Sequence, residues 1–293
     1  MLSINNISKS YGPVQALKNV SFEVPEGSVF GVLGPNGSGK TTLLGIVLDV
    51  LKANAGTYSW FNGMKSDDAR RNIGSLLETP NFYHYLSGIK NLEIAAAIKQ
   101  RGSNDMPRVL EQTGLAARKD SKFSTYSLGM KQRLAIASAL LGHPKVLVLD
   151  EPTNGLDPAG IAEIRQLILD MSASGITIIM ASHLLDEVEK VCTHVAILKR
   201  GDLLLTGPVN EVLLNEDLVE VKAKDMQQLE TILKQMQGIG NLKAVNGVLQ
   251  FTCEPNITTD DINHYCAGQN VYLSHLLLKK KSLETKFMEL TNQ

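Results

Sequence analysis

The sequence has few cysteines and almost no net charge, and each of these features excludes some classes of protein. Its 293 residues include only three cysteines, Cys192, Cys253 and Cys266, and the formal net charge is −1. An odd number of cysteines without the spacing of a disulfide framework indicates reduced thiols, most simply buried ones, in a cytosolic protein. The nearly balanced charge gives no reason to expect a nucleic-acid partner.

Long hydrophobic runs are also missing. The longest apolar stretches, such as LLGIVLDVL, are interrupted by charge, whereas a bilayer-spanning helix needs about 20 consecutive apolar residues. The N-terminal MLSINNISKSYG has neither the basic start nor the apolar stretch of a signal peptide. We therefore expect that, if this protein works at a membrane, another subunit supplies the spanning part.

The chain nevertheless has ample apolar material for a core, because hydrophobic residues make up 43 % of it. Short apolar runs such as VFGVLG alternate with helical patterns up to about residue 215, which predicts an α/β domain with buried parallel strands. Residues from about 88 to 142 are mainly helical and indicate a helical subdomain. Residues 216–293 follow the order βαββαβ, with a hairpin at Asn246-Gly247, and predict a small α+β accessory domain of ferredoxin-like type.

The stretch GPNGSGKTT lies between the strand pattern VFGVLG and the helical pattern TTLLGIVLDVLK. Its glycines leave backbone N–H groups free to surround nucleotide phosphates, and the helix adds its positive N-terminal end. In this pattern the lysine reaches the β- and γ-phosphates, and the hydroxyl that follows it holds Mg²⁺. The candidate nucleotide-binding residues of the loop are Gly34, Pro35, Asn36, Gly37, Ser38, Gly39, Lys40, Thr41 and Thr42.

Two adjacent carboxylates, Asp150 and Glu151, follow the apolar run VLVL. A carboxylate at the end of a buried strand is costly unless it faces a cation, so we expect Asp150 to hold Mg²⁺ together with Thr41. Glu151 points to the same crevice at the carboxyl end of the sheet and is the candidate for activating water. An acidic pair is more often plain surface charge, but its place after a buried strand favours catalysis.

A second candidate anion site lies far along the chain, in TYSLGMKQR. Ser127 and Gly129 come just before the apolar run LAIASALLG, which is typical of a helix N-terminus able to hold an anion. Taken alone, this pattern is more often a helix that a serine caps.

Together these motifs resemble those of the ATP-binding-cassette ATPases, the nucleotide-binding subunits of ABC transporters. GPNGSGKTT, YSLGM, VLVLDEP, NGLDP and the SH of Ser182-His183 come in that family's order, over about residues 1–215. The resemblance implies a P-loop NTPase fold with a mixed sheet and a helical subdomain. It also implies ATP and Mg²⁺ as cofactors, a homodimer or paired cassette that sandwiches two ATP, and integral-membrane permease subunits as partners.

The resemblance assigns roles to five further positions. Ser127 and Gly129 match the signature that binds the γ-phosphate of ATP held by the other subunit, and Asp157 matches a loop that crosses the dimer interface. His183 matches the switch histidine that contacts the γ-phosphate, although a lone histidine is usually structural. Tyr11 matches the aromatic residue that stacks on adenine, with a strand-end tyrosine in the core as the alternative.

Two positions depart from the family pattern. Leu128 stands where the signature usually has its first glycine, and Glu78 stands where most members have a glutamine. A carboxylate at Glu78 can still ligate Mg²⁺ or orient water, so it remains a catalytic and metal-binding candidate. Both departures, with the ending SLETKFMELT, resemble the drug, bacitracin and lantibiotic exporter branch. The implied function is ATP hydrolysis that drives export, at the cytoplasmic face of a bacterial membrane.

Other interpretations remain open at this point. A soluble member of the superfamily, acting in DNA repair or translation, commonly carries long coiled-coil insertions or two cassettes, and neither pattern occurs here. A regulatory nucleotide sensor without turnover is disfavoured because Glu151 and His183 are both present. Phe82, Tyr83 and Tyr85 are either exposed anchors for a transmembrane subunit or part of the local core.

Overall fold

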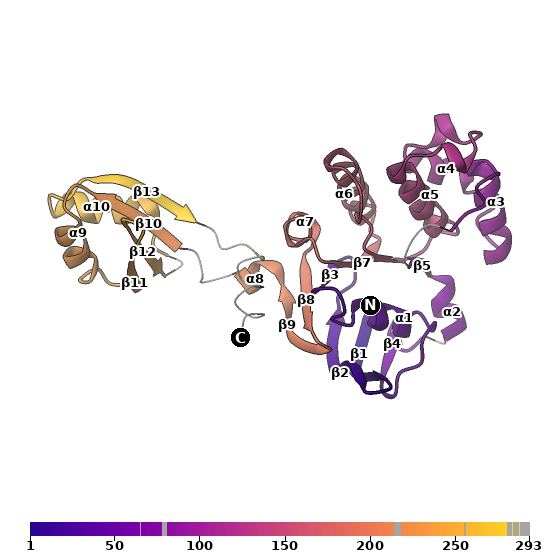
Figure 1. Cartoon of the computed structure of the whole chain (residues 1–293), viewed down its shortest axis with the longest axis horizontal. Helices are drawn as coiled ribbons and strands as arrows, with labels where there is room; N and C mark the ends of the chain where they lie inside the picture. The colour runs from indigo at the N-terminus through magenta and orange to yellow at the C-terminus, as the bar shows by residue number, and fades with distance from the viewer. Residues whose placement is uncertain are drawn as a thin grey trace. The chain divides into compact units, whose positions relative to one another are not determined.

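The computed structural model describes residues 1–64, 66–77, 81–213, 218–254 and 256–279, together with Leu283 and Phe287. The chain divides into two compact units, Met1–Val209 and Asn210–Gln293 (Figure 1). Each unit has its own hydrophobic core and is described by itself. The sequence pattern predicts this boundary near residue 215.

A six-stranded sheet forms the centre of the first unit, in the order β5-β6-β7-β3-β8-β9. Its strands are β3 (Val29–Leu33), β5 (Ile73–Leu76), β6 (Val146–Asp150), β7 (Thr177–Ser182), β8 (His194–Lys199) and β9 (Asp202–Pro208). All neighbours pair in parallel except β8 and β9, so the expected mixed sheet is confirmed. Every residue of β3, β6 and β7 is buried, as expected for parallel strands covered on both faces.

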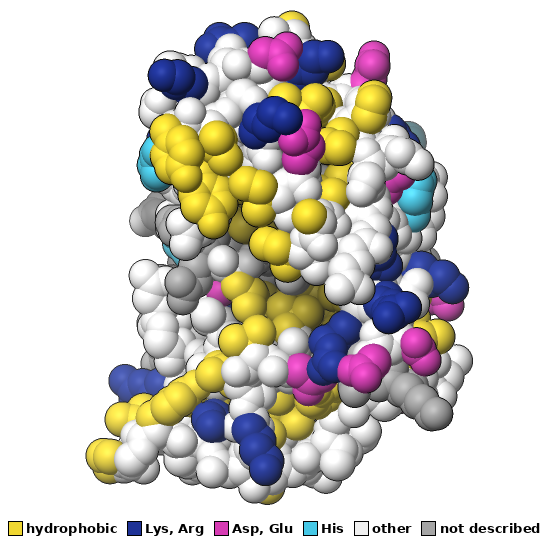
Figure 2. All heavy atoms as spheres, turned by 90° about the vertical axis from the view of Figure 1, so that its right-hand side faces the viewer, with side chains coloured by type: hydrophobic (Ala, Val, Ile, Leu, Met, Phe, Trp, Pro, Cys, Tyr) yellow, Lys and Arg dark blue, Asp and Glu magenta, His cyan; other side chains and the backbone are white. Residues whose placement is uncertain are grey.

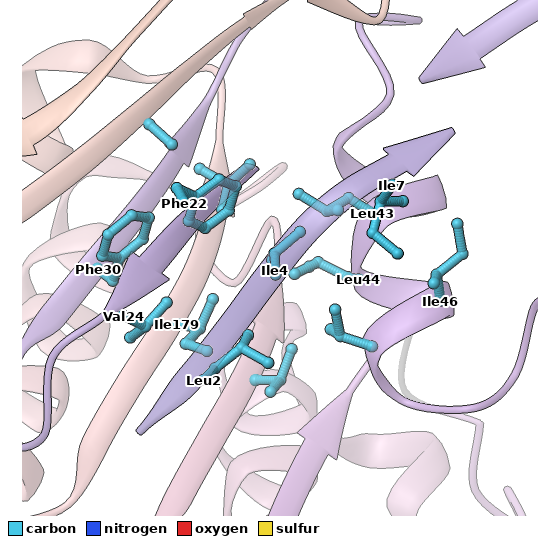
Figure 3. Packing of buried hydrophobic residues seen from close by; sticks show 14 of the residues in the cluster. Leu2, Ile4, Ile7, Phe22, Val24, Phe30, Leu43, Leu44, Ile46 and Ile179 are labelled. Atoms are coloured by element: carbon cyan, nitrogen blue, oxygen red, sulfur yellow. The ribbon is translucent and has the colours of Figure 1, made fainter. Parts of the chain in front are cut away.

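A three-stranded antiparallel sheet packs against one face of this centre. It has the order β2-β1-β4 and consists of β1 (Leu2–Tyr11), β2 (Val14–Val24) and β4 (Ala55–Trp60). Figure 3 shows Leu43 and Leu44 of α1 (Lys40–Val47) turned toward Ile4 of β1 in the core between the sheets. Phe22 of β2 stacks on Phe30 of β3 with ring centroids 5.2 Å apart. This packing holds the start of α1 at the end of β3.

The remaining helices of the first unit fall into two groups. The helical segment expected between residues 88 and 142 contains α3 (Gly88–Lys99), α4 (Met106–Gln112) and α5 (Leu128–Leu140), with short 3-10 turns at Ala116–Arg118 and Phe123–Thr125. Outside it lie α2 (Ser66–Arg71), α6 (Pro158–Ala173) and α7 (Leu185–Val191). Figure 1 shows α3, α4 and α5 gathered at one end of the unit. No helix in the described part of the chain is long and apolar enough to cross a bilayer.

The second unit contains the expected βαββαβ order. After α8 (Val209–Leu213) come β10 (Leu218–Ala223), α9 (Met226–Leu233), β11 (Ile239–Val245), β12 (Val248–Cys253), α10 (Thr259–Gly268) and β13 (Leu273–Lys279). The strands form an antiparallel sheet in the order β11-β12-β10-β13, over a core that includes Val219, Leu229, Phe251 and Ile262. Asn246 and Gly247 both have positive φ, which suits the tight hairpin turn that they form. The final helix expected over SLETKFMEL falls almost entirely outside the described residues.

Candidate functional site

The loop from Gly34 to Gly39 joins β3 to α1, and its glycines are required by close approaches of the backbone. A Cβ built on Gly34 would lie 2.3 Å from the carbonyl oxygen of Leu198, and one on Gly39 would lie 2.4 Å from that of Ala16. Gly39 also has φ of 108°, in a region that L side chains rarely adopt. No described side chain caps α1. The first N–H groups of this helix are therefore available to an anion.

Lys40 curls back over this loop instead of extending into solvent. Its Nζ donates hydrogen bonds to the carbonyl oxygens of Gly34, at 2.8 Å, and Pro35, at 3.4 Å, and the side chain is only 6 % exposed. Ser38 is buried in the same loop, and its hydroxyl has no hydrogen-bond partner among the described residues. A buried ammonium and an unused hydroxyl beside free N–H groups suit phosphate oxygens.

Glu151 connects this loop to the carboxyl end of the sheet. Its Oε1 lies 3.3 Å from Lys40 Nζ, and its Oε2 lies 2.8 Å from His183 Nδ1. The three residues meet because β3, β6 and β7 are parallel neighbours whose carboxyl ends share one edge. Glu151 has φ of 48°, which is strained for a residue other than glycine, and its backbone N–H donates to Ala181 O at 3.0 Å. Strain of this kind concentrates at functional sites.

Oxygen donors suitable for Mg²⁺ lie at the same edge. Asp150 is 4 % exposed at the end of β6, and Thr41 lies exposed in the first turn of α1. No group of three His, Cys, Asp or Glu side chains that could hold a metal occurs in the part of the chain that the structure describes. Magnesium beside a nucleotide needs only one or two carboxylates in addition to phosphate and water oxygens. The residues present therefore fit this ion. Glu78 lies outside the described residues.

Ser127, Gly129 and Asp157 form a second group, at the N-termini of α5 and α6. Ser127 Oγ accepts a hydrogen bond from Met130 N at 3.2 Å, and Asp157 Oδ1 accepts one from Gly160 N at 3.0 Å. Both residues are thus helix caps. Ser127 caps α5, as the alternative interpretation of this segment predicted, and this role is compatible with a second role in binding. Ser127 remains exposed, so its hydroxyl is also accessible to a ligand.

Tyr11 ends β1 and is 47 % exposed. The alternative of a core tyrosine does not fit this exposure, whereas an exposed ring can stack on a base. Lys9 Nζ lies 5.2 Å from the centroid of the ring. The remaining loop residues, Asn36, Gly37 and Thr42, stay where the sequence placed them, between β3 and the first turn of α1.

The aromatic residues after Glu78 do not all follow one interpretation, because one lies in the local core and two are exposed. Phe82 packs edge-on against Phe123, with centroids 5.3 Å apart, and belongs to the local core. Tyr83 and Tyr85 are 50 % and 69 % exposed. A groove of about 400 Å³ lies beside them, lined by Asn81, Phe82, Tyr83, Asn91, Ile94, Ala95, Ile98 and Ser138. Figure 2, which views the α3 side of the molecule, shows hydrophobic side chains gathered in its upper half and in a hollow below.

Sequence reasoning missed two features of the site. It did not foresee that Glu151 joins Lys40 to His183, because these residues are far apart in the chain. It also missed the contact of Leu128 with Gly155, where a Cβ built on the glycine would lie 3.3 Å from Leu128 Cδ2. The sequence signal for that contact is the glycine of NGLDP, Gly155, whose φ is 74° in the structure.

Comparison with known proteins agrees with this geometry. The model of the ABC transporter family matches residues 17–154. A bacitracin transport ATP-binding protein of Enterococcus faecalis is 32 % identical, over 99 % of this chain and 96 % of its own length. The structure of cbiO1 from Clostridium perfringens, part of the ABC transporter complex cbiONQ, has a TM-score of 0.66 at 32 % identity, and the match covers 72 % of this chain and 89 % of that one.

A dimeric ATP-binding cassette solved in a post-hydrolysis state with ADP and Pi has a TM-score of 0.63 at 27 % identity, covering 71 % of this chain and 99 % of its own. The expectations of an ATP-binding fold, of ATP hydrolysis and of kinship with the bacitracin branch are thereby confirmed. The chain belongs to the ABC transporter ATP-binding proteins, and it is an ATPase cassette in which ATP hydrolysis drives transport.

Proposed function

We propose that this chain is the ATPase of an exporter, that two copies sandwich two ATP and two Mg²⁺, and that they act on separate permease subunits at the cytoplasmic face of a bacterial membrane. One observation carries the proposal. Lys40, Glu151 and His183 converge beside an uncapped helix start, whereas Ser127 caps a different helix start in the helical segment. One chain thus offers two anion sites, which suits a nucleotide shared between two chains.

The catalytic steps follow from the contacts of Glu151. ATP entering the loop competes with Glu151 for Lys40, and Lys40 then binds the β- and γ-phosphates through charge-assisted hydrogen bonds. The released carboxylate accepts a proton from the attacking water, whose oxygen bonds to the γ-phosphorus in line as the bond from that phosphorus to the β,γ-bridging oxygen breaks, so that ADP leaves and inorganic phosphate forms. His183, which hydrogen-bonds Glu151 in the free chain, orients that carboxylate, and we assign to it a contact with the γ-phosphate.

Thr41 and Asp150, with Glu78 as a further candidate, are the residues that would hold Mg²⁺. When bound, the ion would neutralise part of the negative charge of the phosphates. Tyr11 stacks on the adenine ring. Ser127 and Gly129 of the partner subunit donate to the γ-phosphate from the opposite side, and Asp157 lies in the loop that follows Glu151 toward the interface. The dimeric cassette with ADP and Pi among the similar structures supports this arrangement.

Coupling to a permease is supported by the groove beside Tyr83. Exposed tyrosines and Ile98, which is 78 % exposed, provide apolar anchors around a concave surface. A helical element from a membrane subunit fits such a groove. Export is supported by the bacitracin transport protein that aligns with nearly the whole chain, although the transported substrate of this chain is set by its permease.

The second unit is proposed as a ferredoxin-like accessory domain. The order βαββαβ supports this proposal, together with a sheet in which β12 lies between β10 and β11 and β13 lies at the far side of β10. Its sheet contains none of the candidate ATPase residues. We therefore assign hydrolysis to residues 1–215 and no catalytic step to residues 216–293.

Mixing two inactive variants tests the composite site. Lys40→Ala and Ser127→Ala chains, combined, leave one site with both defects and one intact site. We expect each variant to hydrolyse ATP poorly alone and the mixture to recover activity. Ser87→Ala is the matched control, because Ser87 caps α3 in the same way, accepting from Lys90 N at 3.4 Å, without lying in a proposed site. A mixture no more active than its separate components would refute the shared site.

A further inference from the structure

The sheet of the second unit has one face covered by helices and one face that carries polar side chains. Val219 and Phe251 form a core with Leu229 of α9 and Ile262 of α10, so both helices cover the same face. Successive side chains of a strand alternate between the two faces of a sheet. With the strand register, this alternation assigns to the opposite face a set that includes Glu220, Lys222, Lys243, Gln250, His275 and Lys279.

Positive charge predominates on this polar face. Lys222, Lys243 and Lys279 are all exposed there, whereas Glu220 is the only acidic residue within the four strands, whose residues are all described. Glu220 Oε1 accepts hydrogen bonds from Gln250 Nε2 and Lys279 Nζ, both at 2.6 Å, and the Glu220 side chain is only 9 % exposed. A ligand that approaches the polar face therefore meets lysines, because the one carboxylate is covered and already paired.

The helices of the same unit carry the opposite charge. The first turn of α10 contains Asp260 and Asp261, and Asp225 caps the start of α9. Glu230 of α9 is paired with Lys234, so this pair adds no net charge. The described part of the second unit is thus polarised, with a cationic sheet face and an anionic helix face. Such a charge distribution orients a protein toward a negatively charged partner.

We propose that the polar face of this sheet docks on the anionic phospholipid headgroups of the membrane surface. The inference rests on the part of the proposed function that places the chain at the cytoplasmic face of a bacterial membrane. Anionic lipids there attract lysines close to the surface. Lys279 is 52 % exposed, and Leu277 of the same strand is 43 % exposed. The lysine stem and the leucine can lie among the headgroups while the ammonium group binds lipid phosphate.

Charge and side-chain type favour lipid over two other occupants of this face. A second copy that used the same face would bring lysines against lysines, which repel. Sheets that bind single-stranded nucleic acid stack the bases on aromatic side chains. The central strands β10 and β12 present Glu220, Lys222 and Gln250 here, and Phe251, the aromatic residue of these two strands, is buried in the core.

Co-sedimentation of the full chain with lipid vesicles, without nucleotide, tests the docking. We expect binding to vesicles of mixed phosphatidylcholine and phosphatidylglycerol, weakened by salt, and no binding to phosphatidylcholine alone. A variant that carries Lys222→Gln, Lys243→Gln and Lys279→Gln together should bind about a hundredfold more weakly, since each lysine near an anionic surface contributes about fivefold.

A charge-matched control removes three exposed lysines from other parts of the chain, through Lys90→Gln, Lys119→Gln and Lys234→Gln. Its affinity for the mixed vesicles should change by less than about fivefold. Equal losses in the two triple variants would overturn the inference, because binding would then depend on net charge and not on this face. Binding of the parent to neither vesicle, or to both equally, would overturn it as well.

Glu220→Gln provides a test that misfolding cannot imitate, because the expected result is a gain. The amide keeps the shape and an acceptor for Lys279 but removes the negative charge, so binding to the mixed vesicles should strengthen by about fivefold. Unchanged or weaker binding would contradict the docking. A dimer that forms without ATP and that the triple sheet variant abolishes would identify a second copy as the occupant instead. ATP hydrolysis in solution tests the proposed function separately, so an active parent that ignores anionic vesicles refutes the docking alone.

Discussion

Replacing Glu151 by Gln exchanges one carboxylate oxygen for an amide nitrogen, and we expect this change to separate ATP binding from ATP hydrolysis. In the free chain the carboxylate lies 3.3 Å from Lys40 Nζ and 2.8 Å from His183 Nδ1, and it is 21 % exposed. The amide keeps the shape and one acceptor oxygen but has neither the charge nor the basicity. Loss of a general base costs about 10²–10⁴ in rate, which corresponds to about 3–5 kcal/mol in the activation barrier.

The same change should strengthen ATP binding, because the competing anion beside Lys40 is removed and a negative charge near the γ-phosphate disappears. Two like charges about 4 Å apart repel by up to about 4 kcal/mol at the effective dielectric constant near a protein surface. We therefore expect tighter ATP binding and a longer-lived dimer, together with turnover that is lower by at least a hundredfold.

Single-turnover hydrolysis at saturating ATP gives the rate, and size-exclusion chromatography with ATP gives the dimer. Glu93→Gln is the matched control, since Glu93 is an exposed residue of α3 paired with Lys90. Hydrolysis by Glu151→Gln within a factor of about ten of the parent would refute the assignment of Glu151 as the base.

Three further predictions follow from the same structure. Lys40→Ala removes two charge-assisted hydrogen bonds to phosphate and should weaken ATP binding by about 10²–10⁴, measured by calorimetry, with near-normal affinity counting against the site. Burial acts to raise the pKa of Glu187, but the Arg165 and Lys190 hydrogen bonds outweigh it and hold that pKa below its usual value. Glu187→Gln should therefore lower the unfolding free energy by roughly 1–2 kcal/mol near pH 7. This difference should vanish as the pH falls through the depressed pKa of Glu187 in the folded chain, and urea titrations at pH 7 and at a pH below that pKa would show it. A chain ending at Val209 should stay soluble and bind ATP, because the first unit has its own core; a folded truncation that binds no ATP would contradict this.

Local chemistry made much of the site predictable from the sequence. A β-branched run followed by GPNGSGKT can hardly be anything other than a strand, a tight loop and a helix start, and the structure has β3, the loop and α1 there. Likewise Asp150 and His183 follow apolar runs that become buried parallel strands. In each case a polar residue ends an apolar run that has to be buried as a strand, and this combination indicates a functional position.

The contacts between these segments could not be read from the sequence in the same way. Lys40, Glu151 and His183 meet only because the sheet has the order β6-β7-β3, in which strands far apart in the chain are neighbours. Strand order depends on long-range packing, and no local pattern encodes it. The same holds for the aromatic segment, where composition does not show that Phe82 faces Phe123 while Tyr83 and Tyr85 face solvent.

Leu128 shows most clearly why motifs cannot be judged one at a time. Taken alone, a leucine in place of a signature glycine brings bulk to a position where backbone has to approach phosphate, and the sequence leaves this approach in doubt. In the structure the bulk is turned toward Gly155, while Gly129 and the hydroxyl of Ser127 remain at the accessible start of α5. A large residue in one segment is matched by a missing side chain in another, as close packing requires. The departure at Leu128 is therefore understood only together with Gly155, because the leucine fills the space that the glycine leaves.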